Sequence, residues 1–360
     1  MKVESQRGQF DLLLRQPPQE TLTRFPTEIK RIIHKVTEPI DEFGNTLSRY
    51  RVVMSEGTPL GLNICQPKER VTDIPVLESP AWFTGLHGFN EGTQRMLGGL
   101  GFPSLLLGYP GGERDSWFKE LTKFIRNPLI TLTELKNLSI AQHAHNMRSL
   151  MNRVNDYLPI ADQIDDSQAL ANGFSRGAMT LLGLPEEVGS ETINIPFALD
   201  VAACFKEGLG RNNIMRAGLQ VPYEVANVAI LGARNLANWG LMSPNTVNLS
   251  PKSIVYELAY TPTLLRGDGG LLAKCVPLSQ NMVILGYGND VAGQLSEWEM
   301  AFINHPNVIV RPAPGAHGSL ILDKRTREYV IQVWAGIAEQ LKNGVNPDKF
   351  NIVHCLPKAS

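Results

Sequence analysis

The stretch Ala169-Leu-Ala-Asn-Gly-Phe-Ser-Arg-Gly-Ala-Met-Thr-Leu-Leu182 decides the fold, because it joins two apolar runs through the pattern G-x-S-x-G. The short run 169–172 is typical of a strand, and the run 178–184 is typical of a helix. A sharp turn between them needs glycine at 173 and 177, because a Cβ would clash with the neighbouring strand and helix. The pentapeptide alone is a weak signal, but its place between strand and helix makes Ser175 a candidate nucleophile.

Apolar runs around this turn alternate between strand and helix spacing, which predicts an α/β fold. We expect a doubly wound, mostly parallel central sheet with helices on both faces. The pattern predicts a hairpin at 50–54 and 60–64, an apolar run at 81–84, strands at 103–107, 281–285 and 308–310, and helices at 93–99, 132–157 and 324–341.

The same pattern divides the chain into four parts. Residues 1–47 form an N-terminal extension, with helical apolar spacing over 28–36, and residues 48–204 form the first part of the core. The alternation breaks down over 205–275, which we interpret as an inserted, mainly helical cap. Residues 276–360 form the second part of the core.

Composition excludes several classes of function. Hydrophobic residues make up 43% of the 360-residue chain and charged residues 19%, so a large core can form. Net charge is −1 without a basic run, which argues against nucleic acid as a partner. The four cysteines are scattered, so we expect neither a zinc site nor a disulfide scaffold, and no motif indicates a metal or an organic cofactor.

The chain carries no sign of export or of a membrane span. Its first twenty residues lack the apolar region of a signal peptide, and no run approaches 18 apolar residues. We therefore expect a cytoplasmic protein. The sequence does not indicate an oligomeric state.

A serine nucleophile needs a base, and the base needs a group that orients it. Asp290 follows the strand expected at 281–285, and His317 lies in a Gly-rich loop after the strand at 308–310. Asn289 and Asp200 remain alternatives to Asp290, because geometry rather than chain order decides the role. His143 and His145 are two apart on an expected helix, so we interpret them as surface or packing residues rather than as a metal pair.

In these motifs the chain resembles the α/β-hydrolase superfamily over about residues 48–343. The resemblance rests on the hairpin, Leu86-His-Gly-Phe89, the turn at 173–177, Asp290 and Gly315-Ala-His-Gly318. It implies Ser175 as nucleophile, His317 as general base and acid, and Asp290 as the residue that orients the imidazole. It also implies an oxyanion hole made by the backbone N–H groups of Arg176 and Phe89.

A serine at the turn argues against the members of this superfamily that use a carboxylate nucleophile. We expect a hydrolase that cleaves a carboxylic ester or thioester through an acyl-enzyme. An acyltransferase, a carbon–carbon-bond hydrolase and a catalytically silent binding protein remain open. The apolar content of the expected cap, including Trp239, Tyr256 and Tyr260, favours a small-molecule substrate with an apolar acyl group.

Overall fold

The computed structural model describes parts of the chain from residue 29 to residue 355. These are residues 29–39, 41, 44–55, 59–80, 86, 89–109, 125–126, 140–159, 163–174, 177–178, 180–181, 282–287, 295, 299, 302–304, 306, 308–313 and 324–355. The cap expected at 205–275 lies outside them, so the division into four parts stays a prediction.

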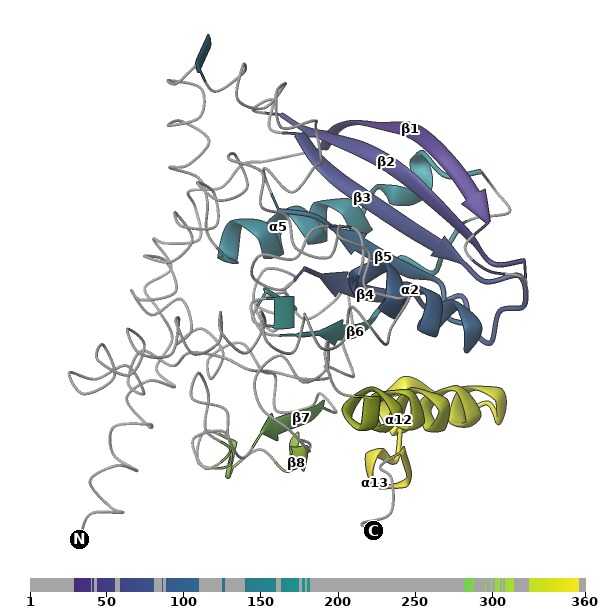
Figure 1. Cartoon of the computed structure of the whole chain (residues 1–360), viewed down its shortest axis with the longest axis vertical. Helices are drawn as coiled ribbons and strands as arrows, with labels where there is room; N and C mark the ends of the chain where they lie inside the picture. Colours follow the sequence, from purple (N-terminus) through teal and green to yellow (C-terminus); the bar gives the residue numbers. More distant parts are fainter. Residues whose placement is uncertain are drawn as a thin grey trace, which may run out of the picture.

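Six strands form the main sheet, in the spatial order β1-β2-β3-β5-β4-β6 (Figure 1). They are β1 (Ile29–Pro39), β2 (Thr46–Met54), β3 (Pro59–Gln66), β4 (Val76–Ser79), β5 (Ser104–Leu107) and β6 (Leu170–Gly173). The pairs β1–β2, β2–β3 and β3–β5 are antiparallel. Strand β4 runs parallel to both β5 and β6. The predicted hairpin is confirmed as β2 and β3, and the sheet is mixed rather than mostly parallel.

The helical spacing expected over 28–36 is wrong, because residues 29–39 form strand β1. Apolar residues at 29, 32, 33 and 36 satisfy a helical template, yet all four are β-branched, and such side chains suit a pleated sheet better. Pairing with β2 over the whole length of β1 then decides the outcome. Two register shifts interrupt this pairing, which lets the apolar spacing depart from strict alternation.

Helices lie on both faces of the sheet, as the alternation predicts (Figure 1). They are α2 (Phe89–Gly99), α5 (Ile140–Met151), α12 (Lys324–Lys342) and α13 (Ile352–Cys355), with 3₁₀ turns at Val154–Asp156 and Pro347–Lys349. Helix α5 packs on the face that carries Leu77 and Leu105. Helices α2 and α12 share a hydrophobic cluster with Val76 and Leu170 on the other face.

Strands β7 (Met282–Tyr287) and β8 (Val308–Ala313) form a second, parallel pair at the positions that the sequence predicts. Alternate residues of β7 enter the two hydrophobic clusters of the main sheet. Ile284 joins the cluster on the α5 face, and Val283 joins the cluster of α2 and α12. Burial on both faces is what a strand inside a helix-covered parallel sheet requires.

Strand β4 was not predicted. The apolar run expected at 81–84 lies outside the described residues, and the strand occupies 76–79 immediately before it. All four residues of β4 are buried, including Glu78, whose charge interrupts the apolar pattern that a sequence search relies on.

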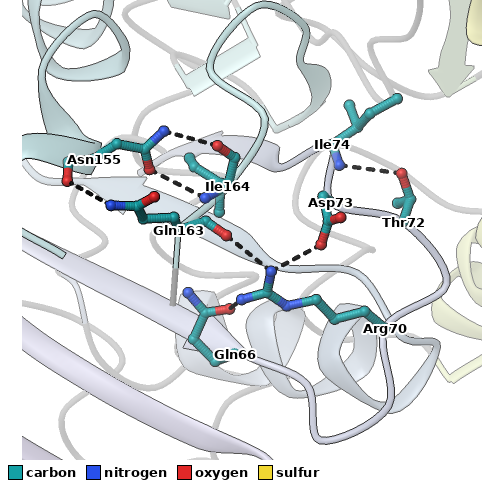
Figure 2. Close-up of polar contacts among 8 residues, drawn as sticks. All are labelled: Gln66, Arg70, Thr72, Asp73, Ile74, Asn155, Gln163 and Ile164. Atoms are coloured by element: carbon teal, nitrogen blue, oxygen red, sulfur yellow. Dashed lines mark hydrogen bonds and ion pairs between the residues drawn. The ribbon is translucent and has the colours of Figure 1, made fainter. Parts of the chain in front are cut away.

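A polar brace closes the edge of the sheet where β4 and β6 begin. Arg70 donates 2.9 Å hydrogen bonds to Asp73 Oδ1 and to the carbonyl oxygen of Gln163. Asn155 Nδ2 donates to the carbonyl oxygen of Ile164 at 2.8 Å. Figure 2 shows how these side chains join the segment before β4 to the segment before β6. The brace therefore links the two segments at the points where they enter the sheet.

Candidate active site

Strand β6 ends in the sharp turn that its sequence predicts. The strand stops at Gly173, and residues 177, 178, 180 and 181 are already helical. The backbone N–H of Gly177 donates to the carbonyl oxygen of Phe174 at 3.0 Å, which closes the turn. Ser175, the predicted nucleophile, falls inside this turn in the chain but lies outside the described residues.

Both glycines of the turn are in crowded positions. A Cβ on Gly177 would overlap the carbonyl oxygen of Ser79 at the end of β4 and lie 2.8 Å from its carbonyl carbon. A Cβ on Gly173 would lie 2.5 Å from the Cα of Ala178. Backbone atoms cannot move aside as a flexible side chain can, so the predicted clash with strand and helix is confirmed.

Tyr109 ties the helix after this turn to the neighbouring strands. Its hydroxyl accepts a hydrogen bond from Ser79 Oγ at 3.2 Å and lies 2.6 Å from Thr180 Oγ1. The ring of Tyr109 stacks on His143 of α5, with 3.9 Å between the centroids. His143 Nε2 lies 3.2 Å from the carbonyl oxygen of Leu107, so this histidine has the packing role that the sequence predicts.

A row of mostly polar side chains crosses the sheet beneath α2. Asn63, Leu106, Glu78 and Asn172 lie directly opposite one another on β3, β5, β4 and β6. Directly opposed residues share one face of a sheet. This polar row, Asn63 to Asn172, lies on the face covered by α2 and α12, because Val76 two residues before Glu78 belongs to their cluster.

Glu78 is the ionisable residue of the polar row, and it is buried. Asn172 Nδ2 donates to its Oε2 at 3.1 Å. Burial raises the pKa of the Glu78 carboxyl to about 8, although hydrogen bonds from Thr93, Asn172 and Ser104 lower it in part. Near neutral pH the carboxyl is therefore largely protonated and uncharged.

Asn63 holds both flanks of the loop that leads into α2. Its side-chain Nδ2 donates a hydrogen bond to the backbone carbonyl oxygen of Leu86 at 2.9 Å. Its backbone carbonyl oxygen accepts a hydrogen bond from Gln94 Nε2 of α2 at 3.4 Å. Phe89, the predicted oxyanion-hole donor, is the first residue of α2. His87 and Gly88 between these anchors lie outside the described residues.

The remaining predicted site residues also lie outside the described residues, so their arrangement stays a prediction. These are Arg176, Asp290 and His317, with the alternatives Asn289 and Asp200. The strands before Asp290 and His317 are described, and Tyr287 of β7 pairs with Ala313 of β8 at their carboxyl ends. The two strands that precede the predicted acid and base in the chain thus end side by side.

Sequence reasoning missed the polar row and Tyr109. Asn63 and Glu78 each interrupt an apolar run inside a strand, which is a signal that a search for motifs passes over. A buried polar group needs a partner, so each such interruption could have pointed to a structural or functional contact.

Among the described residues, no group of three or more His, Cys, Asp or Glu side chains is placed to hold a metal ion. Within the same part of the chain, no helix has the length and apolar character needed to cross a membrane.

No protein-family model and no curated protein matches this sequence. Solved structures do resemble the fold. DcsB, solved in complex with its substrate analogue, is 10% identical with a TM-score of 0.51, over 83% of this chain and 99% of that chain. A thermostable carboxyl esterase from Bacillus coagulans, in complex with glycerol, is 13% identical with a TM-score of 0.49, over 83% and 98% of the two chains.

A hydrolase from Pseudomonas aeruginosa PA01 is also 13% identical, with a TM-score of 0.46 over 80% of this chain and 98% of that chain. The likeness to DcsB, at its low identity, is one of fold. The solved structures that resemble this chain thus include hydrolases and esterases, all at low identity.

Proposed function

We propose that this chain is a serine hydrolase of α/β-hydrolase fold that cleaves a carboxylic ester or thioester through an acyl-enzyme on Ser175. The observation that carries the proposal is the crowded turn after β6. Gly177 lies against the backbone of Ser79, and Gly173 lies against that of Ala178. A strand-to-helix turn this tight is the setting in which G-x-S-x-G exposes a nucleophilic serine.

The proposed reaction has two halves. Ser175 Oγ attacks the carbonyl carbon while His317 takes the hydroxyl proton, and Asp290 stabilises the imidazolium. The tetrahedral intermediate collapses, and the leaving group departs with the proton from His317. Water, deprotonated by His317, then attacks the acyl-enzyme and releases the acid, which regenerates Ser175. The chemistry uses no metal or organic cofactor.

The place of residues 86–89 in the chain, between β4 and α2, supports the proposed oxyanion hole. This loop joins β4 to α2, and β4 is the parallel neighbour of β6. Parallel neighbours end at the same edge of a sheet, so the backbone N–H groups of Phe89 and Arg176 belong to adjacent loops. Such donors stabilise charge that develops in the transition state, and losing one costs about 3–4 kcal/mol.

The substrate we propose is a small molecule with an apolar acyl group. Asp290 and His317 follow the paired strands β7 and β8, which supports an acid and a base from neighbouring loops. An acyltransferase on the same residues would differ in the second half only, where an alcohol or thiol would replace water as the attacking group.

A fluorophosphonate probe tests the proposal without knowledge of the substrate. We expect a single adduct on Ser175, located by peptide mapping and absent from Ser175→Ala. Ser167→Ala is the matched control, because Ser167 is exposed in the bend before β6, at the opposite end of that strand from the turn that contains Ser175. Absence of an adduct on folded wild-type protein would contradict the proposal and favour a silent binding protein.

Unlabelled protein, in which Ser175 is free to react, would then be given a panel of esters and thioesters, with and without an added alcohol or thiol. Release of the free acid in the presence of these acceptors supports hydrolysis. A new ester or thioester among the products would instead identify an acyltransferase.

A further inference from the structure

Asn63 is an unusual residue for its position. It is 1% exposed, in a strand whose other residues from 60 to 66 are all buried, and it lies opposite Leu106 of β5. A buried amide without partners costs about 1–3 kcal/mol, so its hydrogen bonds have to be made inside the protein. The partners of those hydrogen bonds show which segment the side chain stabilises.

Two hydrogen bonds of Asn63, one from its side chain and one to its backbone, join it to the residues on either side of the proposed oxyanion loop. The side chain holds the carbonyl oxygen of Leu86 ahead of the loop, and the backbone carbonyl holds Gln94 behind it. Gln94 is completely buried and also donates to Ser104 Oγ of β5 at 3.3 Å. One residue of β3 therefore fixes the entry to the loop and helps to fix the helix that leaves it.

The side chain of Leu86 is fixed as well. It packs over Gly108, where an added Cβ would lie 3.1 Å from Leu86 Cγ and Cδ2. Gly108 itself is held to β3, because its N–H donates to the carbonyl oxygen of Gly61 at 2.8 Å. Leu86 thus rests on a rigid base and has a polar clamp on its carbonyl oxygen, and the loop begins from a defined position.

We propose that Asn63 is a positioning residue of the proposed hydrolase, which holds Leu86 and helix α2 so that the N–H of Phe89, the first residue of α2, meets the oxyanion of the transition state. The inference rests on the proposed function. Oxyanion donors act at 2.7–3.1 Å, and a displacement of about 1 Å in a reacting group can cost about 100-fold in rate. Asn63 is 1% exposed and therefore out of reach of a bound substrate, so we expect its loss to leave ground-state binding intact.

The test compares Asn63→Ser with Asn155→Ser. The serine hydroxyl ends one bond short of the amide nitrogen, so each variant loses an asparagine clamp on a backbone carbonyl, of Leu86 in one case and of Ile164 in the other. Asn155 lies in the brace of Figure 2, at the sheet edge where β4 and β6 begin. Asn63→Leu keeps the branching of the side chain at Cγ, removes its polar atoms, and serves as a second variant if the serine variant folds poorly.

For Asn63→Ser we expect kcat on an ester to fall about 10- to 100-fold per folded molecule, with KM within about twofold of wild type. Affinity for a trifluoromethyl ketone, which forms a tetrahedral oxyanion with the serine, should fall by the same factor as kcat/KM. Asn155→Ser should keep kcat within about twofold, even where its melting temperature is lower.

Unchanged kcat in both Asn63 variants would overturn the inference, as would equal losses in Asn63→Ser and Asn155→Ser. These outcomes are separate from failure of the proposed function. If wild-type protein is labelled on Ser175 and hydrolyses the ester, the function stands whatever Asn63 does. If wild-type protein is neither labelled nor active, the function and the role of Asn63 fall together.

Discussion

Replacing Glu78 by Gln should stabilise the protein at neutral pH, and the gain should grow with pH. Glu78 is 3% exposed, and burial raises its pKa from 4.5 to about 8. Gln has nearly the same shape, and its amide oxygen can still accept the 3.1 Å bond from Asn172. The substitution therefore removes the ionisation and keeps the contact.

The direction of the pH effect follows from proton binding in the two states. Below pH 4.5 the carboxyl is protonated both in the folded and in the unfolded chain, so it adds no pH dependence. Between pH 4.5 and 8 the unfolded chain releases the proton and the folded chain keeps it, so the free energy of unfolding falls as pH rises. Above pH 8 both states are ionised and the dependence ends.

The magnitude follows from the same pKa values. Each pH unit between them contributes about 1.4 kcal/mol, which amounts to about 3 kcal/mol at pH 7 and about 5 kcal/mol above pH 8. The Cys65 thiol on the same face stays neutral over this range, because burial raises its pKa to about 12. No side chain of β3 therefore changes its charge in the pH range where Glu78 titrates.

Urea unfolding of wild type and Glu78→Gln, measured from pH 4.5 to pH 9, checks this prediction. The two curves should converge at the acid end and separate steadily up to pH 8. Glu339→Gln is the matched control, because Glu339 is exposed on α12 and its replacement should change stability by no more than about 0.5 kcal/mol. A difference between wild type and Glu78→Gln that does not vary with pH would refute the reasoning.

Three further predictions concern the turn, its support and the catalytic acid. Gly177→Val should abolish activity or folding, because its Cβ would overlap the backbone at the end of β4. Gly92→Ala, on α2, has open space around the new Cβ and should raise the free energy of unfolding by up to about 1 kcal/mol, measured in a thermal melt. Tyr109→Phe should lose about 1–2 kcal/mol of unfolding free energy in urea, because it breaks the links of a buried hydroxyl to β4 and to the helix after the turn. Asp290→Asn should cut kcat on an ester by about 10⁴-fold and Asp200→Asn should not, and the reverse result would assign the acid to Asp200.

The sequence predicted the elements whose signal is local. The hairpin β2–β3, the short strand β6 and the helix α12 each carry a periodic apolar pattern inside one segment, and the structure contains all of them. The crowding at Gly173 and Gly177 was also predictable, because a sharp turn from strand to helix brings backbone atoms close to both positions.

The elements that were missed depend on distant parts of the chain. β1 has a helical apolar spacing and becomes a strand only because β2 is available to pair with it. β4 contains Glu78, whose partner Asn172 is 94 residues further along the chain. Asn63 finds the carbonyl oxygen of Leu86 at a separation of 23 residues. No local sequence pattern encodes such distant partners. The sequences of the strands that contain these residues therefore lack a regular apolar pattern.

The distribution of polarity in the sheet ties its stability to the proposed site. On the α5 face, β4 and its neighbours present Leu77, Leu105 and Ala171 in one apolar row. On the α2 face, the row nearest the turn after β6 and the loop before α2 contains Asn63, Glu78 and Asn172. Apolar side chains of similar volume would bury there at lower free energy, because the polar row has to be desolvated and hydrogen-bonded.

Stability alone therefore does not explain the polar row, but its hydrogen bonds indicate a positioning role. Asn63 reaches the backbone ahead of the proposed oxyanion loop, and Asn172 joins β6 to β4 just before the turn that contains Ser175. An apolar row would pack the same strands but would offer no directional contact to the Leu86 carbonyl oxygen. On the α2 face, next to the hydrophobic cluster of α2 and α12, the polar row thus gives up part of the stability that apolar side chains would add, and it provides directional contacts at the sheet edge where we propose the catalytic residues.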